Sequence, residues 1–356
     1  MHPHGETTNG LRANHRPGGA RDGARVSRRT FIAAGAAALS VPFIARSVSA
    51  QAKVFRISTP GSADEWQSKA LVKFKEELDK NAAGQFNVQL HYNGTLFAQG
   101  TEIEAMQRSN LECALTSPQD ISNLIPEYSI FTTGYLMRSP AHLDAVYDGD
   151  VGAEYKARVA KQVGIQIVRS QYLGTRHVIL RQPRNVRTPA DMAGLKLRMP
   201  GSETWQFLGA ALGANPTPLA FEEVYLALQT GTIDGLENPL PDAMAAKFYE
   251  VSKQVVLTGH MVANVFFSLA GGFWNSLSAE QRKAIEAAET AAKKLNDDGV
   301  LETEKTASAF FEGKGVKVTT PDVAAFRNQV QKRFLESKFA KTWPSGILDR
   351  INKAGS

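Results

Sequence analysis

The sequence predicts an α/β fold in which short strands alternate along the chain with longer helices. From residue 55 onward, short apolar and β-branched runs are separated by segments whose apolar residues recur at helical spacing. Strands that alternate with helices in this way are typical of largely parallel sheets covered by helices. At 356 residues the chain is also long enough for two domains, each with a sizeable core.

The first part of this pattern predicts three strands and two helices. The strands are expected at 55–59, 86–92 and 113–116, and the helices at 64–81 and 102–109. Residues 86–92 alternate apolar and polar side chains strictly, which is typical of a strand with one buried face. In the first helix, Trp66, Phe74 and Leu78 belong to one apolar stripe.

A second unit is expected to open at residues 164–168, and its turns are clearly marked. Thr188-Pro189-Ala190-Asp191 combines an N-cap residue, a proline at the first helical position and an acid at the third. Gly194 ends that short helix. In the strand that follows, residues 195–199, the apolar residues point to one face, and Lys196 and Arg198 to the other.

Two further helices are predicted towards the C-terminus. Residues 221–230 form a helix that Gly231 ends. Ser278 and Gln281 form a capping box, which opens a helix running to about Gly313. Its buried stripe is expected to contain Ile285, Ala288, Ala292, Leu295 and Phe310.

Nearly all of the net charge lies in the first fifty residues. Residues 1–50 hold seven arginines and no lysine against Glu6 and Asp22, a net charge of +5 out of a formal +6 for the whole chain. The remainder is therefore close to neutral, and the high isoelectric point is no argument for nucleic-acid binding.

The same segment has the features of an export signal. Ser27 to Ile32 is a twin-arginine pattern, an apolar run covers 31–45, and Val48-Ser49-Ala50 offers small residues for a signal peptidase. The alternative is an arginine-rich tail without structure. We expect residues 1–50 to be removed and the mature protein to begin near Gln51 in the periplasm. The run is too short, and too interrupted by glycine and proline, to span a bilayer.

Cys113 is the single cysteine of the chain, so no internal disulfide can form. It lies in an apolar run with no histidine close by in sequence. A small buried strand residue is therefore the expected role, rather than a nucleophile.

Three segments of the second unit resemble one family. They are 194–200 (GLKLRMP), 213–231 (GANPTPLAFEEVYLALQTG) and 233–240 (IDGLENPL). Together they resemble the substrate-binding subunit of tripartite ATP-independent periplasmic (TRAP) transporters, of the DctP type. The similarity extends over the mature chain from about Phe55, and so long an ordered string is far more specific than a short motif.

The resemblance implies a two-lobed periplasmic binding protein-like fold of class II type, with mixed sheets, a ligand cleft between the lobes and a long bracing helix near the C-terminus. Lobe I would comprise 51–173 plus about 264–300, and lobe II 174–263 plus about 301–356. The lobes would close on a small organic acid, and the protein, acting as a monomer without cofactor or metal, would deliver it to a TRAP membrane permease.

The resemblance also implies which residues contact the ligand. Arg198 would clamp its carboxylate, because a guanidinium presents paired donors in the plane of a carboxylate. The other implied contacts are Arg176, Asn238, Phe221 and Glu102, with Asn93, Gln119 and Trp66 as weaker candidates. Each has a structural rival: a salt bridge for Arg176, an Asn-Pro turn for Asn238, a core position for Phe221 and a helix N-terminus for Glu102.

Three other functions stay open at this point. An enzyme is disfavoured, because the sequence holds no nucleophile elbow, P-loop or histidine pair at metal-ligand spacing. A binding protein for an ATP-driven importer would share the two lobes but lack the motif around Arg198. A periplasmic ligand sensor would differ only in its membrane partner. The sequence does not identify the acid.

Overall fold

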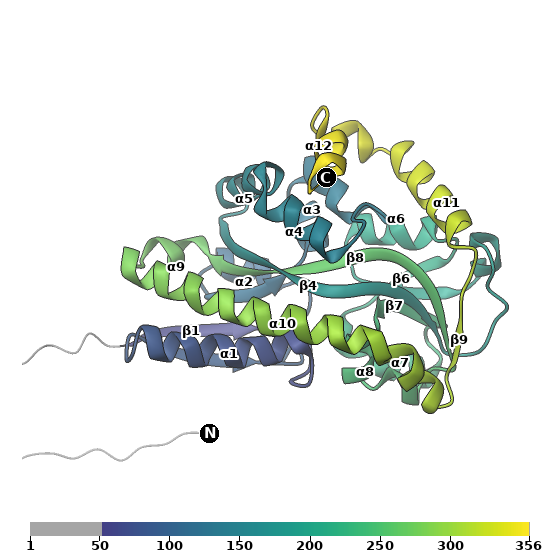
Figure 1. Ribbon diagram of the computed structural model, residues 1–356, viewed down its shortest axis with the longest axis horizontal. Coiled ribbons are helices and arrows are strands. Elements are labelled where there is room, and N and C mark those ends of the chain that lie inside the picture. Colours follow the sequence, from purple (N-terminus) through teal and green to yellow (C-terminus); the bar gives the residue numbers. More distant parts are fainter. Residues whose placement is uncertain (1–51, 356) are drawn as a thin grey trace, which may run out of the picture. The chain divides into compact units, whose positions relative to one another are not determined.

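The computed structural model describes residues 52–355, and the predicted leader, residues 1–50, lies outside them. The α/β prediction is confirmed: strands and helices alternate, and the strands form one mixed sheet in the order β2-β1-β3-β8-β4-β7-β5-β6, with β9 beside β8 (Figure 1). The strands are β1 (Lys53–Ser58), β2 (Phe86–His91), β3 (Cys113–Thr116), β4 (Ile165–Leu180), β5 (Lys196–Met199), β6 (Asn215–Pro218), β7 (Gly235–Pro239), β8 (Gln254–Ala270) and β9 (Lys317–Thr319).

Helices cover this sheet. The α-helices are α1 (Trp66–Asn81), α2 (Glu102–Gln107), α3 (Pro118–Ser122), α4 (Pro140–Asp148), α5 (Asp150–Gln162), α6 (Glu203–Ala211), α7 (Val224–Thr230), α8 (Leu240–Ala245), α9 (Gly271–Asn275), α10 (Ala279–Gly313), α11 (Val323–Leu335) and α12 (Ile347–Lys353). The short 3-10 helices are η1 (Pro126–Thr132), η2 (Pro189–Met192), η3 (Phe221–Glu223), η4 (Phe248–Glu250) and η5 (Ala340–Thr342). In the view of Figure 1, α1 and α8 lie below the long strands, and α5, α6, α11 and α12 above them.

Two long antiparallel strands, β4 and β8, join the two ends of the sheet. β8 pairs with β3 at one end, β4 pairs with β7 at the other, and the two strands pair with each other over most of their length. Strands β1, β2 and β3 pair in parallel, as do β5, β6 and β7, and the antiparallel strands β4 and β8 make the sheet mixed, as the resemblance implied. Both long strands run through the sheet without an exposed residue, since all their residues are buried or half-buried.

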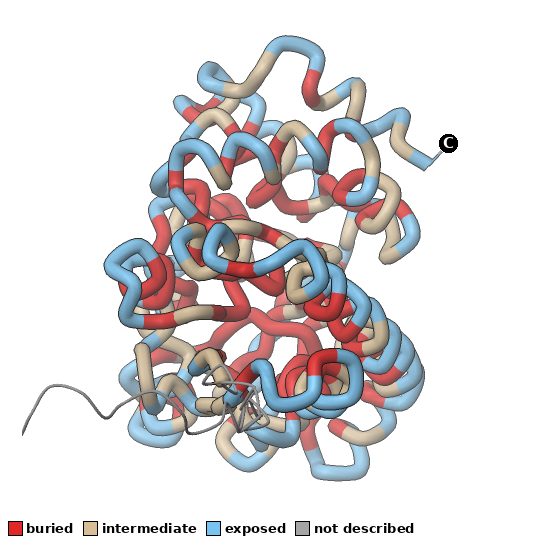
Figure 2. Tube along the Cα trace, turned by 90° about the vertical axis from the view of Figure 1, so that its left-hand side faces the viewer, coloured by how far each residue is buried: buried red, intermediate tan, exposed pale blue. Residues whose placement is uncertain are grey.

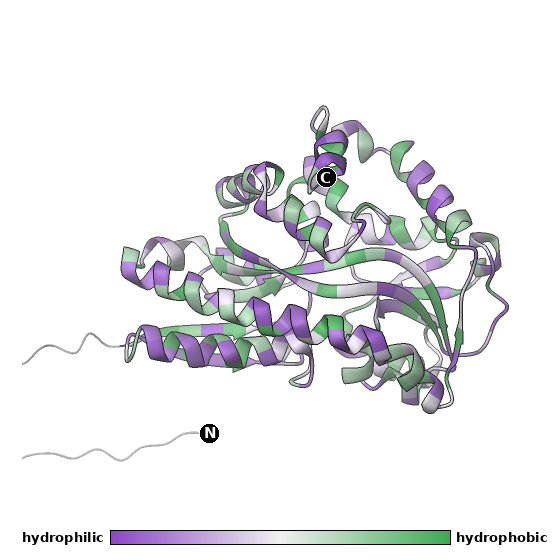
Figure 3. Ribbon diagram, in the orientation of Figure 1, coloured by the Kyte–Doolittle hydropathy of each residue, from purple (hydrophilic) through white to green (hydrophobic). Residues whose placement is uncertain are grey.

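The long helix is confirmed with its predicted ends, 279 and 313. Ser278 and Gln281 form the capping box, and α10 packs along α1 and β4. Two residues of the predicted stripe are misplaced: Leu295 is 37% exposed and Phe310 is half-buried, whereas the next positions, Asn296 and Phe311, are fully buried. In Figure 3 the viewer-facing side of α10 is largely hydrophilic, as expected for a helix with one face on the core.

Buried side chains form four apolar clusters along the sheet. Two contain residues of the first 163 positions, around Phe74 and Tyr155, and two contain residues of the β5–α7 region, around Trp205 and Leu228. Figure 2 shows the buried chain concentrated in the strands, with exposed residues on the outer helices. Cys113 is fully buried in β3, as predicted. None of the helices in residues 52–355 has the length and apolar character needed to cross a membrane.

Candidate ligand-binding site

A cavity of about 90 Å³ lies between residues from the two ends of the sheet. This volume holds several water molecules, since each needs about 10–15 Å³ measured in this way. Five of the residues predicted from the sequence line it: Arg198, Arg176, Asn238, Phe221 and Gln119. The remaining lining residues come mainly from the end of β1, from α3 and from β8.

Arg198 reaches the cavity because β5 alternates its side chains. Leu197 and Met199 are buried in the apolar core, which leaves Arg198 on the opposite face. Its side chain is nevertheless only 1% exposed. Nε donates to the carbonyl of Leu219 (2.8 Å), and Nη2 donates to Oε1 of Gln99 (2.6 Å).

No carboxylate among residues 52–355 lies within ion-pair distance of Arg198, and Nη1 has no hydrogen-bond partner there. Burial lowers the pKa of Arg198 to about 10, against the attraction of the Glu237 charge. A buried cation without a counter-ion is costly, because it has lost its water without gaining a partner. An anion bound beside Arg198 would therefore be stabilised by its charge.

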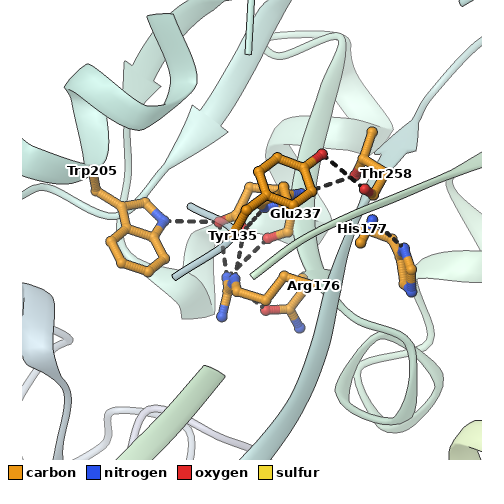
Figure 4. A network of polar contacts seen from close by, with 9 residues as sticks. Tyr135, Arg176, His177, Trp205, Glu237 and Thr258 are labelled. Atoms are coloured by element: carbon orange, nitrogen blue, oxygen red, sulfur yellow. Dashed lines mark hydrogen bonds and ion pairs between the residues drawn. The ribbon is translucent and has the colours of Figure 1, made fainter. Parts of the chain in front are cut away.

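Arg176 is a buried cation that does have its counter-ion. Nε and Nη2 contact the carboxylate of Glu237 at 2.5 and 2.8 Å, as the view in Figure 4 shows. Nη2 also donates to Oδ1 of Asn238 (3.1 Å). The structural rival proposed from the sequence, a salt bridge, is therefore present, and Arg176 lines the cavity as well.

Glu237 is the centre of this network. It accepts from Nε1 of Trp205 (2.9 Å) and contacts Nε2 of His260 (3.0 Å) in addition to Arg176. Burial by itself raises the pKa of Glu237, but the charge of Arg176 and the bonds from His260 and Arg176 lower it to about 2. Burial lowers the pKa of His260, so its ring is neutral, and its Nε2 carries the hydrogen that Glu237 accepts. The network therefore holds Arg176 in place.

Asn238 follows Glu237 on β7 and is only 4% exposed. Its Oδ1 accepts from Arg176, while its Nδ2 is buried without any partner in the described residues. An amide N–H that is buried and unpaired costs free energy of about 1–3 kcal/mol. A ligand oxygen in the cavity would remove that cost.

Phe221 and Gln119 complete the group of predicted residues at the cavity. The Phe221 ring centre lies 5.9 Å from Cζ of Arg198 and packs edge to face with Phe248. Phe221 begins the 3-10 turn η3 rather than the α-helix predicted at 221–230, which starts at Val224. Gln119, on α3, is 6% exposed.

Three predicted residues do not line this cavity. Trp66 lies between α1 and α10. Its ring packs so closely on Gly299 that a Cβ added to Gly299 would lie 2.4 Å from the ring, and its Nε1 donates to Oγ1 of Thr303 (2.8 Å). Glu102 accepts from the backbone N–H of Gly100 (2.7 Å) just before its own helix, and burial raises its pKa to about 8. Asn93 lines an outer hollow instead.

The outer hollow adjoins the cavity, with which it shares Pro60 and Phe221. Asn93 lines the outer hollow and not the cavity, so it lies outside the inner site. The positions of Trp66 and Glu102 away from the cavity have one physical cause. Each side chain meets its needs locally, Trp66 by packing on a glycine of the facing helix and Glu102 by accepting from its own N-terminal turn.

Several polar residues at the cavity were not predicted from the sequence. Gln99 contacts Arg198 directly. Other lining residues have buried polar side-chain atoms without a partner in the described chain: Gln67, Thr133, Asp242 and Asn264. The only sequence signal for them is a polar residue inside an otherwise buried apolar segment, as at Asn264 in β8.

Across residues 52–355, no group of three or more His, Cys, Asp or Glu side chains is arranged to hold a metal ion. The cavity thus combines two guanidinium groups with amide, hydroxyl and carboxyl groups that have free hydrogen-bonding capacity. Such a set of groups can bind an anion that also carries several hydroxyl groups.

Known proteins with similar sequences are solute-binding proteins. The family model described as bacterial extracellular solute-binding protein, family 7 (DctP), matches residues 57–341. A solute-binding protein of Verminephrobacter eiseniae is 33% identical over 301 residues, which is 84% of this chain and 88% of that protein. The 2,3-diketo-L-gulonate-binding periplasmic protein of Escherichia coli is 29% identical over 85% of this chain and 92% of its own length.

Solved structures have the same fold. A TRAP periplasmic solute-binding protein of Roseobacter denitrificans, crystallised with 3-deoxy-D-manno-oct-2-ulosonic acid, is 44% identical with a TM-score of 0.82, covering 85% of this chain and all of that one. Another from the same species, with bound L-galactonate, is 27% identical with a TM-score of 0.79, covering 86% and 99%. The predicted periplasmic binding protein-like fold is thus confirmed.

Proposed function

This chain belongs to family 7 of the bacterial extracellular solute-binding proteins, the DctP family, and we propose that Arg198 binds the carboxylate of a small organic acid in its cavity. The observation that carries this proposal is the buried guanidinium of Arg198, which lacks a carboxylate partner in the described chain and keeps Nη1 free. A ligand carboxylate supplies the missing charge and can accept from Nη1, because Nε and Nη2 of Arg198 already donate to Leu219 and Gln99.

We further propose that the acid is a polyhydroxylated sugar acid with one carboxylate. The relative that is 44% identical contains 3-deoxy-D-manno-oct-2-ulosonic acid, which supports this class. A second carboxylate would need a second free cation, but Arg176 is already paired with Glu237. The other ionisable side chains lining the cavity are the acids Glu65, Asp120 and Asp242, which offer no positive charge to a second carboxylate and suit hydroxyl groups.

Capture by closure is our proposal for the mechanism. The predicted lobes, 51–173 plus about 264–300 and 174–263 plus about 301–356, meet where β4 and β8 cross between the two ends of the sheet. The pairing register of these strands shifts between Tyr172 and Gly174 and between Arg176 and Val178, and such irregularities are natural places for a bend. Gln99 and Arg198, which come from different lobes, are in contact at 2.6 Å.

The proposed partners and location follow from family membership. The mature protein would act in the periplasm as a monomer and release its ligand to a TRAP permease, rather than catalyse a reaction. Residues 1–50 would direct export by the twin-arginine route. Replacing Arg28 and Arg29 together by lysine should then leave the uncleaved precursor in the cytoplasm, and normal periplasmic accumulation of that variant would contradict the route.

Calorimetry on the mature protein tests the ligand. The probes are 3-deoxy-D-manno-oct-2-ulosonic acid, D-galactonate and succinate. We expect binding of at least one sugar acid and much weaker binding of succinate. Arg198→Lys should weaken sugar-acid binding at least about tenfold, because lysine cannot present two donors in one plane. Arg108→Lys, at an exposed position on the surface, is the matched control.

Two outcomes would contradict the proposal. Equal affinity of the wild type and Arg198→Lys would remove Arg198 from the carboxylate site. Binding of succinate but of neither sugar acid would leave an organic-acid binding protein, yet would show that the ligand class is wrong.

A further inference from the structure

Two carboxyl groups from distant parts of the chain lie at the same cavity. Glu65 immediately precedes α1, and Asp242 lies in the first turn of α8. Both line the cavity, and their residues are only 6% and 4% exposed. They come from the two predicted lobes, so a ligand enclosed in the cavity can contact both of them.

These two carboxyl groups have few hydrogen-bond partners. Oε1 of Glu65 accepts from the backbone N–H of Ser62 (3.1 Å). Oδ1 of Asp242 is buried and has no partner in the described residues. Neither side chain forms an ion pair within residues 52–355. Two buried carboxylates in this state would each carry the cost of an unpaired charge.

The charges around the cavity leave no cation for this pair. Its two guanidinium groups are those of Arg176 and Arg198. Glu237 neutralises Arg176, and under the proposed function the ligand carboxylate neutralises Arg198. Glu65 and Asp242 would therefore add uncompensated negative charge if they were ionised, in a site that binds an anion.

We propose that Glu65 and Asp242 carry protons in the closed cavity and act as specificity-determining hydrogen-bond donors to the ligand's hydroxyl oxygens, so that capturing the ligand also takes up a proton. This inference rests on the proposed function and deepens it. A protonated carboxyl group has one O–H donor and a remaining acceptor, which matches a hydroxyl group that also donates and accepts. An ionised carboxylate can only accept.

The groups around the pair favour this protonation. Burial, with the charge of Asp242, raises the pKa of Glu65 well above its ordinary range. Burial raises the pKa of Asp242 to about 8; Arg176 on β4 opposes the rise, and Glu304 on α10 adds to it. On the other elements packed against α8, Glu237 of β7 is engaged by Arg176, and Glu250 of η4 accepts from Tyr225.

Proton uptake has a definite direction with pH. In an open, hydrated cleft both groups have ordinary pKa values near 4, whereas in the closed cavity Asp242 holds its proton up to about pH 8 and burial raises the pKa of Glu65 as well. Between these limits the closed form binds more protons than the open form. Affinity should therefore fall about tenfold per pH unit for each proton taken up, and should level off above about pH 8.

Calorimetry in two buffers of different ionisation enthalpy measures this uptake directly. With 3-deoxy-D-manno-oct-2-ulosonic acid as the probe, at about pH 7, the wild type should take up about one proton or more per ligand bound. Glu65→Gln and Asp242→Asn should each reduce that number and flatten the pH profile of affinity. Glu286→Gln, at an exposed position on α10, should change neither. Zero uptake by the wild type overturns the proposal.

A measurement that does not depend on this probe keeps the proposal separate from the ligand's identity. If the probe does not bind, the proposed ligand is wrong, and infrared spectroscopy on the complex with whichever organic acid does bind decides on the pair. A carboxylic-acid C=O band of the wild type at about pH 7, lost in the Glu65→Gln/Asp242→Asn double variant, supports protonation in the conformation of this structure. If no such band is found in that case, protonation of the pair is refuted.

Discussion

Glu237 and Asp242 are two buried carboxyl groups, five residues apart, whose pKa values are shifted in opposite directions. Glu237 lies in the network of Arg176, His260 and Trp205, and its pKa falls to about 2 (Figure 4). Asp242 lines the cavity with Oδ1 buried and unpaired in the described residues, and its pKa rises to about 8. Both groups are desolvated to a similar degree, so the difference comes from their partners.

The difference separates structural from ligand-directed polar groups. Every donor around Glu237 is supplied by the protein, so this network orients Arg176 with or without a ligand. At Asp242, Gln67 and Asn264, by contrast, the protein leaves buried side-chain atoms without a hydrogen-bond partner in the described residues. Buried polar atoms without partners are costly, and at a binding site the ligand provides the compensation.

The largest expected effect comes from breaking the satisfied network. Glu237→Gln leaves Arg176 buried without a counter-ion, and should lower the free energy of unfolding by about 3–5 kcal/mol. Urea or thermal unfolding measures the loss, with Glu286→Gln as an exposed control. A loss below about 1 kcal/mol would mean that solvent or a rearranged side chain replaces Glu237, and would undo the contrast with Asp242.

A second prediction concerns Asp242 in the protein saturated with ligand. In that closed form the pKa of Asp242 is higher than in the unfolded state, so the folded protein binds more protons between about pH 4 and 8. Its stability should fall as the pH rises through this window, by up to about 1.4 kcal/mol per unit. Asp242→Asn should remove this dependence, as seen in unfolding curves across the pH range. Parallel profiles for the wild type and Asp242→Asn would be evidence of an ordinary pKa.

The contact between Gln99 and Arg198 offers a smaller effect on affinity. Gln99→Ala removes the acceptor for Nη2, and a hydrogen bond to a charged group contributes about 1.5 kcal/mol. Sugar-acid binding should weaken about tenfold in calorimetry. Gln85→Ala, at an exposed residue in the turn before β2, should bind as the wild type does. Unchanged affinity of Gln99→Ala would mean that the ligand alone orients Arg198.

The smallest effect is expected outside the cavity. Trp66→Phe keeps the packing on Gly299 but loses the hydrogen bond to Thr303, which should cost about 1 kcal/mol of stability. Thermal unfolding measures this cost, and ligand affinity should stay unchanged. A clear loss of affinity would restore Trp66 as a ligand residue, against its position between α1 and α10.

Local patterns in the sequence predicted several elements of this fold, among them β1, β2, β5 and α1. Strand β3 and helix α10 have the predicted ends, because a short apolar run and a capping box act within a few residues. Alternation in β5 also placed Arg198 on the face opposite the core. With the resemblance to the DctP family, these patterns led to the correct fold and family, and four of the five leading site residues line the cavity.

Only the tertiary structure decided how these parts combine. The single sheet depends on the pairing of β4 with β8. The paired residues lie 74 to 105 positions apart in the sequence, and no local pattern predicts such a pairing. The same holds for the partners that distinguish Glu237 from Asp242 and pair Gln99 with Arg198. The sequence by itself determined which charged groups the chain carries and on which strand face Arg198 lies. Whether a group is paired or left for a ligand depends on distances between remote segments, and those exist only in the folded chain.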